Sequence, residues 1–269
     1  MATTIPAGLV KQLRDETGAG MMDCKRALSE AGGDLDAARR LLRERGMAQA
    51  LKRQVRETTE GKVLSRLDDG RGVLVAVGCE TEPVSNNEEF LAFANRVLDL
   101  VDEQGPDAVE TLKDEQQALI AKLGENIVTR GAARFEAAEG ERVAAYVHPP
   151  ANKIGVLVKV RGGTDELARQ VAMHIAFSAP RWTTRTEVTD DWVESERAIY
   201  ERLPEVLSKP EQARPKIVEG MLNKRFYAAS PGGVLDEQAW IYETNKTVKQ
   251  ALEEASAEIV GFARYSVSE

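Results

Sequence analysis

The chain has 269 residues, of which 42% are hydrophobic and 30% charged, and its formal net charge is −8. This composition is typical of a soluble protein with enough residues for two or three compact units. The sequence contains no stretch approaching the roughly 20 apolar residues that span a bilayer. The acidic excess argues against nonspecific binding to nucleic-acid phosphates. We therefore expect neither a membrane partner nor a direct nucleic-acid partner.

Location and redox state are inferred from the N-terminus and from the few cysteines and histidines. Residues 1–6 lack the basic and then apolar layout of a secretory signal, so we expect a cytoplasmic protein. Cys24 and Cys79 are interpreted as buried, reduced thiols. His174 lies on a predicted apolar helix and is interpreted as a core or boundary residue. Neither His148 nor His174 has a neighbour at metal-ligand spacing, so no metal and no cofactor is predicted.

The first 46 residues have the apolar spacing of three short helices. Glycines separate the apolar groups, Asp34 is positioned to cap the third helix, and Gly46 is expected to end it. A basic stretch from Arg39 to Arg56 also contains acids and is interpreted as a solvated helix face rather than a nucleic-acid patch. Residues 47–59 are interpreted as a linker, with a helix as the open alternative. We therefore assign residues 1–57 to an N-terminal three-helix domain and its linker.

The middle and C-terminal parts of the chain share a repeated pattern. Residues 72–82 align without a gap with residues 155–165, and each segment follows a predicted strand and turn and precedes an apolar helix. Hairpin connections favour antiparallel pairing, so the pattern predicts an α+β core of two related halves, each with a small antiparallel sheet and helices. The first half is assigned to residues 58–141. The second half is assigned to residues 142–186 and 227–269.

An insertion divides the second half of the core. Residues 187–226 are mostly polar with a thin apolar stripe at helical spacing, and prolines mark a turn near position 210. This pattern predicts an inserted helical hairpin. Its apolar stripe must contact either the hairpin itself or a partner, and self-association into a homodimer through the hairpin is one of the open alternatives.

Motifs of nucleotide-using and hydrolytic enzymes are absent from the sequence. There is no P-loop, no Gly-x-Gly-x-x-Gly after a strand and no nucleophile elbow. Asn245-Lys246-Thr247 is similar to a guanine-reading element, but Val248 stands where that element needs an aspartate, so we interpret the segment as a helix start. The sequence therefore favours a protein that is not an enzyme.

One segment of the N-terminal domain combines glycines with two adjacent methionines. Residues 13–28 are Leu-Arg-Asp-Glu-Thr-Gly-Ala-Gly-Met-Met-Asp-Cys-Lys-Arg-Ala-Leu. The glycines permit a tight bend, and methionine is an adaptable apolar residue that is favoured at recognition surfaces. Composition alone leaves two alternatives for Met21 and Met22, which either fill the small core or face a partner.

This run resembles a signature of the bacterial elongation factor Ts family. The resemblance extends in order along nearly the whole chain, through residues 42–46, 122–127, 154–158, 172–176, 216–220, 246–248 and 261–267. It implies an N-terminal domain resembling the ubiquitin-associated (UBA-like) fold, a two-part core and an inserted helical hairpin. It also implies a protein of translation that binds elongation factor Tu and promotes release of its GDP.

The resemblance assigns partner contacts to two sets of residues. In the family, an Asp-Phe pair after the central strand of the first half disturbs the Mg²⁺ and phosphate site of elongation factor Tu. This chain has Glu82 and Pro83 at those positions, and the proline is expected to hold Glu82 extended. The predicted contact residues are Thr81, Glu82, Pro83 and Val84 in this loop, and Arg14, Gly20, Met21 and Met22 in the N-terminal domain. A protein that binds elongation factor Tu as a stabiliser, without exchange activity, is the alternative.

Overall fold

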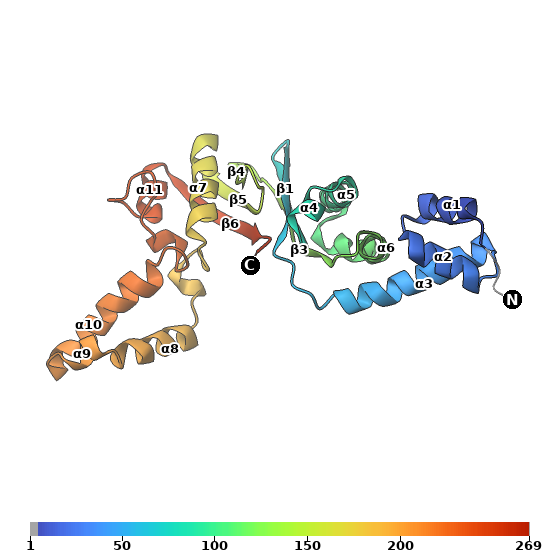
Figure 1. Ribbon diagram of the computed structural model, residues 1–269. Coiled ribbons are helices and arrows are strands. Elements are labelled where there is room, and N and C mark those ends of the chain that lie inside the picture. The colour runs from blue at the N-terminus through green and yellow to red at the C-terminus, as the bar shows by residue number, and fades with distance from the viewer. Residues whose placement is uncertain (1–4, 269) are drawn as a thin grey trace.

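Three helices form the N-terminal end of the molecule in the computed structural model, which describes residues 5–268 (Figure 1). They are α1 (Ala7–Thr17), α2 (Met21–Glu30) and α3 (Leu35–Arg53). The carboxylate of Asp34 accepts a hydrogen bond from the backbone N–H of Ala37 at 2.9 Å, so the predicted cap of the third helix is confirmed. Residues 1–4 lie outside the described range. They are part of the segment, residues 1–6, whose composition does not predict a secretory signal.

The third helix does not end at Gly46, so that prediction was wrong. α3 continues to Arg53 and packs against α6 (Lys113–Leu123) of the core. A Cβ atom at position 46 would lie 2.9 Å from the Cβ of Ala121, so the glycine permits close helix approach and does not terminate the helix. The Arg53 guanidinium then donates a hydrogen bond to the Ile120 carbonyl at 3.3 Å. The predicted linker is therefore helical as far as residue 53.

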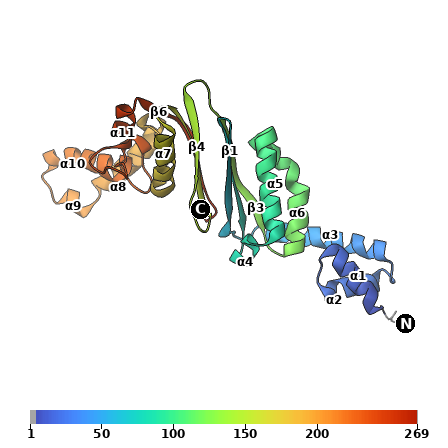
Figure 2. The same ribbon diagram turned by 90° about the horizontal axis from the view of Figure 1, so that it is seen from above.

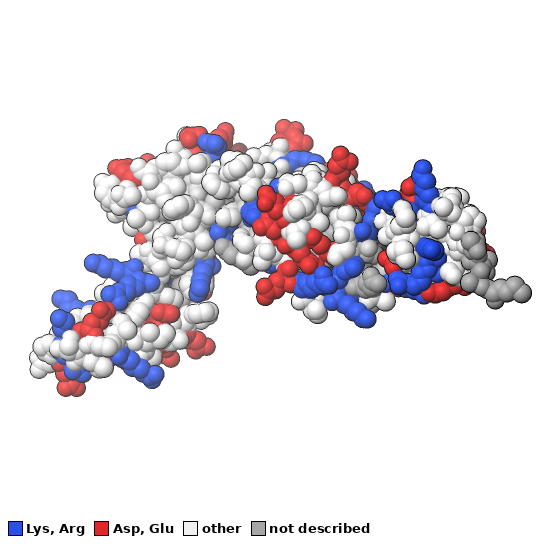
Figure 3. Space-filling view, in the orientation of Figure 1, with Lys and Arg blue, Asp and Glu red and all other residues white. Residues whose placement is uncertain are grey.

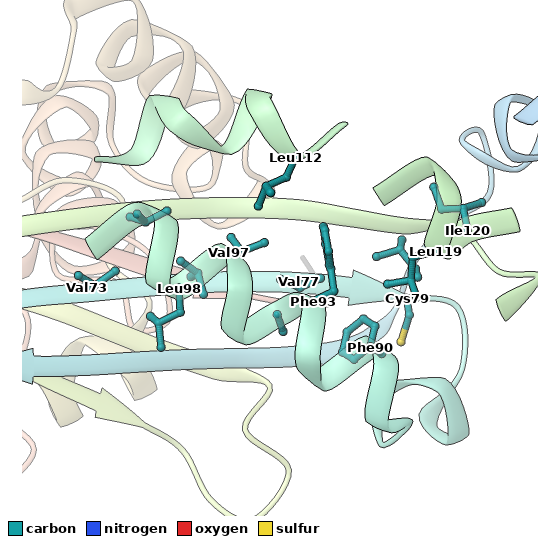
Figure 4. Packing of buried hydrophobic residues seen from close by; sticks show 14 of the residues in the cluster. Val73, Val77, Cys79, Phe90, Phe93, Val97, Leu98, Leu112, Leu119 and Ile120 are labelled. Carbon is teal, nitrogen blue, oxygen red and sulfur yellow. The ribbon is translucent and has the colours of Figure 1, made fainter. Parts of the chain in front are cut away.

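The first half of the core contains a three-stranded antiparallel sheet covered by helices on one face. Its elements are β1 (Glu60–Asp68), β2 (Arg71–Cys79), α4 (Glu82–Ser85), α5 (Glu88–Gln104), a 3₁₀ helix (Pro106–Leu112), α6 and β3 (Ile127–Glu136). The strand order is β1-β2-β3. Figure 4 shows Phe90, Phe93 and Val97 of α5 pointing towards Val77 and Cys79 of β2. Alternate residues of the central strand therefore build the core beneath α5.

The second half repeats this arrangement, as the sequence repeat predicts. It contains β4 (Glu141–Val147), β5 (Ile154–Gly162), α7 (Asp165–Ser178), a 3₁₀ turn (Leu235–Glu237), α11 (Val248–Glu254) and β6 (Ala257–Ser266). The strand order is β4-β5-β6, again antiparallel. The Thr247 hydroxyl caps α11 by accepting from the Gln250 N–H at 3.2 Å, so the interpretation of this segment as a helix start is confirmed.

The two sheets pack face to face, and the helices lie on their outer faces (Figure 2). Gly72 and Gly155, which the sequence repeat aligns, occupy equivalent places in this interface. A Cβ at Gly72 would lie 2.7 Å from Leu157 Cδ1, and a Cβ at Gly155 would lie 3.0 Å from Leu74 Cδ1. Each glycine thus makes room for a buried leucine of the other sheet, which explains why both halves carry glycine at this position.

The insertion forms a helical hairpin at the end of the molecule opposite the N-terminal helices (Figure 1). It contains a 3₁₀ turn (Arg185–Glu187), α8 (Asp190–Glu201), α9 (Pro204–Leu207), a second 3₁₀ turn (Glu211–Ala213), α10 (Arg214–Met221) and a π-helical turn (Leu222–Tyr227). Part of its apolar stripe packs on the hairpin itself, through Tyr200, Val206, Val218 and Leu222. Trp182 contacts Trp192 and Phe226 edge-on and joins the hairpin to the core.

Candidate functional site

The predicted contact loop of the first half forms a single exposed helical turn, α4, directly after β2. Thr81 precedes it in an extended conformation, with φ −130° and ψ 153°. Glu82 and Pro83 are both exposed, whereas Val84 is half-buried and Ser85 is buried. The expectation that Glu82 is extended was wrong, because Pro83 sits in the first helical turn, where its missing N–H costs nothing, and the extended residue is Thr81.

A carboxylate from another loop fixes the start of α4. Glu125, between α6 and β3, accepts hydrogen bonds from the backbone N–H groups of Glu80 and Thr81 at 3.1 and 3.0 Å. Its other oxygen accepts the Thr81 hydroxyl at 2.6 Å. Hydrogen bonds to a carboxylate are stronger than those between neutral groups, so the residues that lead into α4 are held firmly while Glu82 and Pro83 project outward.

The neighbouring residues join this loop to the linker from the N-terminal domain. The carboxylate of Glu80 accepts the backbone N–H of Asn126 at 2.7 Å and pairs with Arg56 at 3.4 Å. The side-chain amide of Asn126 donates to the carbonyl oxygens of Gln54 and Arg56 at 3.3 and 2.7 Å. Three segments distant in the chain therefore meet at one point, which we call the junction: residues 54–56, 80–81 and 125–126.

Cys79, at the end of β2, is buried and lies beneath α4. Its thiol donates a hydrogen bond to the Thr81 carbonyl at 3.3 Å. Burial, with a smaller contribution from the charge of Glu125, raises the pKa of the Cys79 thiol to about 12. The thiol is therefore neutral at physiological pH, and the interpretation of both cysteines as buried, free thiols is confirmed.

The four residues predicted in the N-terminal domain are all exposed. Arg14 lies in the last turn of α1, and Gly20 precedes α2. Met21 and Met22 begin α2 with exposed fractions of 55% and 72%, so the alternative in which they fill the core was wrong. Figures 1 and 2 show α1 and α2 packed beside the part of α3 that lies far from the core, away from α4. The structure therefore presents the two predicted sets as separate patches.

Basic side chains gather along α3, as Figure 3 shows in the orientation of Figure 1. Two of them form ion pairs within the chain: Arg39 pairs with Glu16 and Asp36, and Arg45 pairs with Glu30. This pairing fits the interpretation of the stretch as a solvated helix face.

Metal-binding clusters and membrane-spanning helices are both absent from the part of the chain that the structure describes. Between residues 5 and 268, no cluster of three or more His, Cys, Asp or Glu side chains is arranged to hold a metal ion. Over the same residues, no helix combines the length and the apolar character that crossing a bilayer requires.

Comparison with known proteins decides the family. The sequence model of the family described as Elongation factor TS matches residues 80–269. The elongation factor Ts of Thioalkalivibrio sulfidiphilus is 39% identical over 99% of this chain and 93% of its own length. Those of Alkalilimnicola ehrlichii and Escherichia coli are 39% and 38% identical, each over 98% of this chain and 92% of their own length. The chain belongs to the elongation factor Ts family.

Membership in the elongation factor Ts family makes the chain a nucleotide exchange factor of translation elongation and not an enzyme. Its partner is elongation factor Tu. The residues that hold the junction, Glu125 and Asn126, were not among the predicted site residues. They lie in the run 122–127 that carries part of the resemblance to elongation factor Ts, but their spacing in sequence contains no sign of what they contact.

Proposed function

We propose that this chain promotes GDP release from elongation factor Tu by pressing α4 against the Mg²⁺ and phosphate site of its partner. Exchange on elongation factor Tu is the function of the family to which the chain belongs. The proposal concerns the residues responsible and how they act. Thr81, Glu82, Pro83 and Val84 form the wedge, and the single turn of α4 enters the partner.

The observation that carries this proposal is an exposed turn on a rigid base. Glu82 and Pro83 are exposed at the start of α4, while three hydrogen bonds to Glu125 hold the residues just before them. A preorganised contact loses little conformational entropy when it binds, so more of its binding energy is available to distort the partner. Glu82 brings a negative charge, which repels phosphate groups and competes with them for a cation.

The driving force is a difference in affinity between two states of the partner. The exchange factor binds the distorted, nucleotide-free state of elongation factor Tu more tightly than the GDP-bound state, and this shifts the population towards release. By thermodynamic reciprocity, GDP weakens the binding of the factor by the same ratio. The process needs no covalent step in this chain.

We propose the N-terminal patch as a second, docking contact. Met21 and Met22 expose adaptable apolar surface at the start of α2, with Gly20 beside them and Arg14 nearby in sequence on α1. This patch lies apart from α4, so it contributes affinity without itself reaching the nucleotide site. Two separate contacts also orient the wedge on its target.

Pro83 replaces the aromatic residue that is usual in the family, and this replacement reduces the apolar area of the wedge. Truncation of an aromatic anchor at an interface commonly costs about 2 kcal/mol or more. Proline keeps a rigid apolar face at the first turn of α4. We therefore expect the substitution Pro83→Phe to increase exchange with an unadapted elongation factor Tu.

Stopped-flow release of a fluorescent GDP analogue from the cognate elongation factor Tu tests the wedge. The double substitution Glu82→Ala/Pro83→Ala is expected to lower the maximal release rate by at least about tenfold, since removal of interface anchors costs about 1.4 kcal/mol or more. Glu103→Ala, an exposed acid at the far end of α5, is the matched control. Equal maximal rates for the double variant and the wild type would overturn the proposal.

We propose in addition that the hairpin is the contact for a second copy of the chain, in the cytoplasm where elongation takes place. Trp192 and Ile199, seven residues apart on α8, lie on one helix face, and both are about half exposed, as is Leu207 on α9. An apolar face of this kind at the end of an extended hairpin supports self-association.

A further inference from the structure

We propose that Glu125 and Asn126 are positioning residues for nucleotide exchange, with Glu125 setting the conformation of α4 and Asn126 setting the linker to the N-terminal domain. The inference rests on the proposed function, in which α4 is the wedge and the N-terminal patch is the docking contact. It adds that two consecutive residues of one loop hold both contacts in a fixed relationship.

At the junction, the side chain of Glu125 bonds only to the two residues that lead into α4, Glu80 and Thr81. Its carboxylate accepts two backbone N–H groups and the hydroxyl of Thr81, at distances of 3.1, 3.0 and 2.6 Å. The two N–H donors belong to the residues that come directly before α4, so these bonds fix where the helix begins and in which direction it leaves β2. Glu125 therefore anchors, from a distant loop, the connection between β2 and α4.

The side chain of Asn126 acts on the linker instead. It is 5% exposed, and its amide group donates to the carbonyls of Gln54 and Arg56 at 3.3 and 2.7 Å. Both residues lie within three positions of the end of α3, so the bonds hold the chain where it leaves the N-terminal domain. An amide group buried in this way must keep its partners, because breaking these bonds leaves buried polar atoms unsatisfied.

Glu80 connects the two functions through the backbone. Its carboxylate accepts the backbone N–H of Asn126 at 2.7 Å, while its own N–H donates to Glu125. Arg56, on the linker, pairs with the same Glu80 carboxylate at 3.4 Å. These bonds join residues 80–81 to residues 125–126 in both directions, so displacing one loop strains the other. The wedge and the linker therefore keep one relative placement.

The division of labour between adjacent residues makes the inference testable by substitution. Glu125→Ala removes all three hydrogen bonds at the base of α4 and leaves the Asn126 side chain in place. Asn126→Ala removes the two bonds to the linker and leaves its backbone N–H on Glu80. Glu125→Gln is the conservative variant, because one amide oxygen still accepts two N–H groups and the Thr81 hydroxyl can rotate to accept from the amide nitrogen.

The experiment measures GDP release from elongation factor Tu over a range of factor concentrations, using the full-length chain. Glu125→Ala is expected to lower the maximal rate about tenfold, the size of effect that losing charge-assisted hydrogen bonds produces, with little change in the half-saturating concentration. Glu125→Gln is expected to recover most of the rate. Asn126→Ala is expected to raise the half-saturating concentration about fivefold at a nearly unchanged maximal rate.

Hydrogen exchange separates a positioning role from general loss of structure. The backbone amides of Glu80 and Thr81 are expected to exchange faster in Glu125→Ala, while amides in the centre of β2 keep their protection. A wild-type maximal rate in Glu125→Ala would overturn the inference, and so would parallel losses of rate and affinity in both alanine variants. If Glu82→Ala/Pro83→Ala also releases GDP at the wild-type rate, the proposed function fails. If that variant releases GDP slowly and Glu125→Ala does not, only the positioning role fails.

Discussion

At the scale of single residues, His174 illustrates a polar side chain that serves the core. The ring is fully buried on α7, stacks on Trp240 at 5.2 Å between centroids, and meets the Gln238 side-chain oxygen at 3.1 Å. Burial lowers the pKa of His174 from its ordinary value, against a smaller opposing contribution from Gln238. The interpretation of His174 as a core residue is thereby confirmed.

A pH dependence of stability follows from the lowered pKa of His174. In the unfolded chain, His174 has the ordinary histidine pKa of 6.5 and binds a proton below that pH, whereas in the folded chain it binds the proton only at a lower pH. The free energy of unfolding therefore falls as the pH falls through this range. Urea titrations at pH values from about 7.5 to about 5 measure this fall in the free energy of unfolding. The fall is expected to be smaller in His174→Gln than in the wild type. His148→Gln changes the exposed histidine as a control, and equal losses in wild type and His174→Gln would contradict the account.

At the scale of elements, the path of α3 shows how packing overrides a local signal. A glycine in a helical pattern usually marks an end, yet Gly46 lies within α3 because α6 crosses close to it. The same contact brings Arg53 to the Ile120 carbonyl and delivers residues 54–56 to the junction. One helix–helix contact therefore sets where the N-terminal patch lies relative to α4.

Two glycine substitutions separate packing from helix propensity. Gly46→Ala places a Cβ 2.9 Å from Ala121, so overpacking, which typically costs about 1–3 kcal/mol, is expected to outweigh the gain in propensity. Gly220 lies on the exposed face of α10, and a Cβ added there would meet no neighbouring residue within 4 Å. Gly220→Ala is therefore expected to raise the free energy of unfolding by about 0.5–1 kcal/mol. Denaturant unfolding measures both; a stabilising Gly46→Ala would show that α6 yields easily.

At the scale of the whole molecule, the two related halves stack through their sheets and leave the ends free for contacts. The N-terminal helices extend from one end and the hairpin from the other (Figure 1). The two sheets place a buried interface at the centre, with Gly72 and Gly155 admitting leucines from opposite sides. A rigid centre of this kind holds the contact surfaces at fixed separations.

The proposed homodimer is tested at this scale by sedimentation equilibrium of the full chain. The wild type is expected to dimerise, and Ile199→Asp/Leu207→Asp is expected to be monomeric, because it places charges on the exposed apolar face of the hairpin. Phe177→Asp is the matched control, since Phe177 is apolar and 79% exposed but lies on α7. A monomeric wild type, or dimers that persist in the double variant, would contradict the proposal.

Most elements of this fold follow from patterns that are local in the chain. The apolar spacing, the capping signal at Asp34 and the gapless repeat of residues 72–82 and 155–165 predicted the three N-terminal helices, the two antiparallel sheets and the inserted hairpin. The run of residues 13–28 carried the resemblance to the family. These features depend on neighbours a few positions away, so periodicity and composition contain them.

The details of the site depend on contacts between distant parts of the chain, and only the folded chain contains them. Whether Met21 faces outward, whether Gly46 ends a helix and how Glu82 is held were decided by packing and by hydrogen bonds across loops. Glu125 reaches Thr81 across 44 positions of sequence, and Asn126 reaches Arg56 across 70. No local pattern encodes such partners, because each is chosen by where the folded backbone brings an acceptor to a donor.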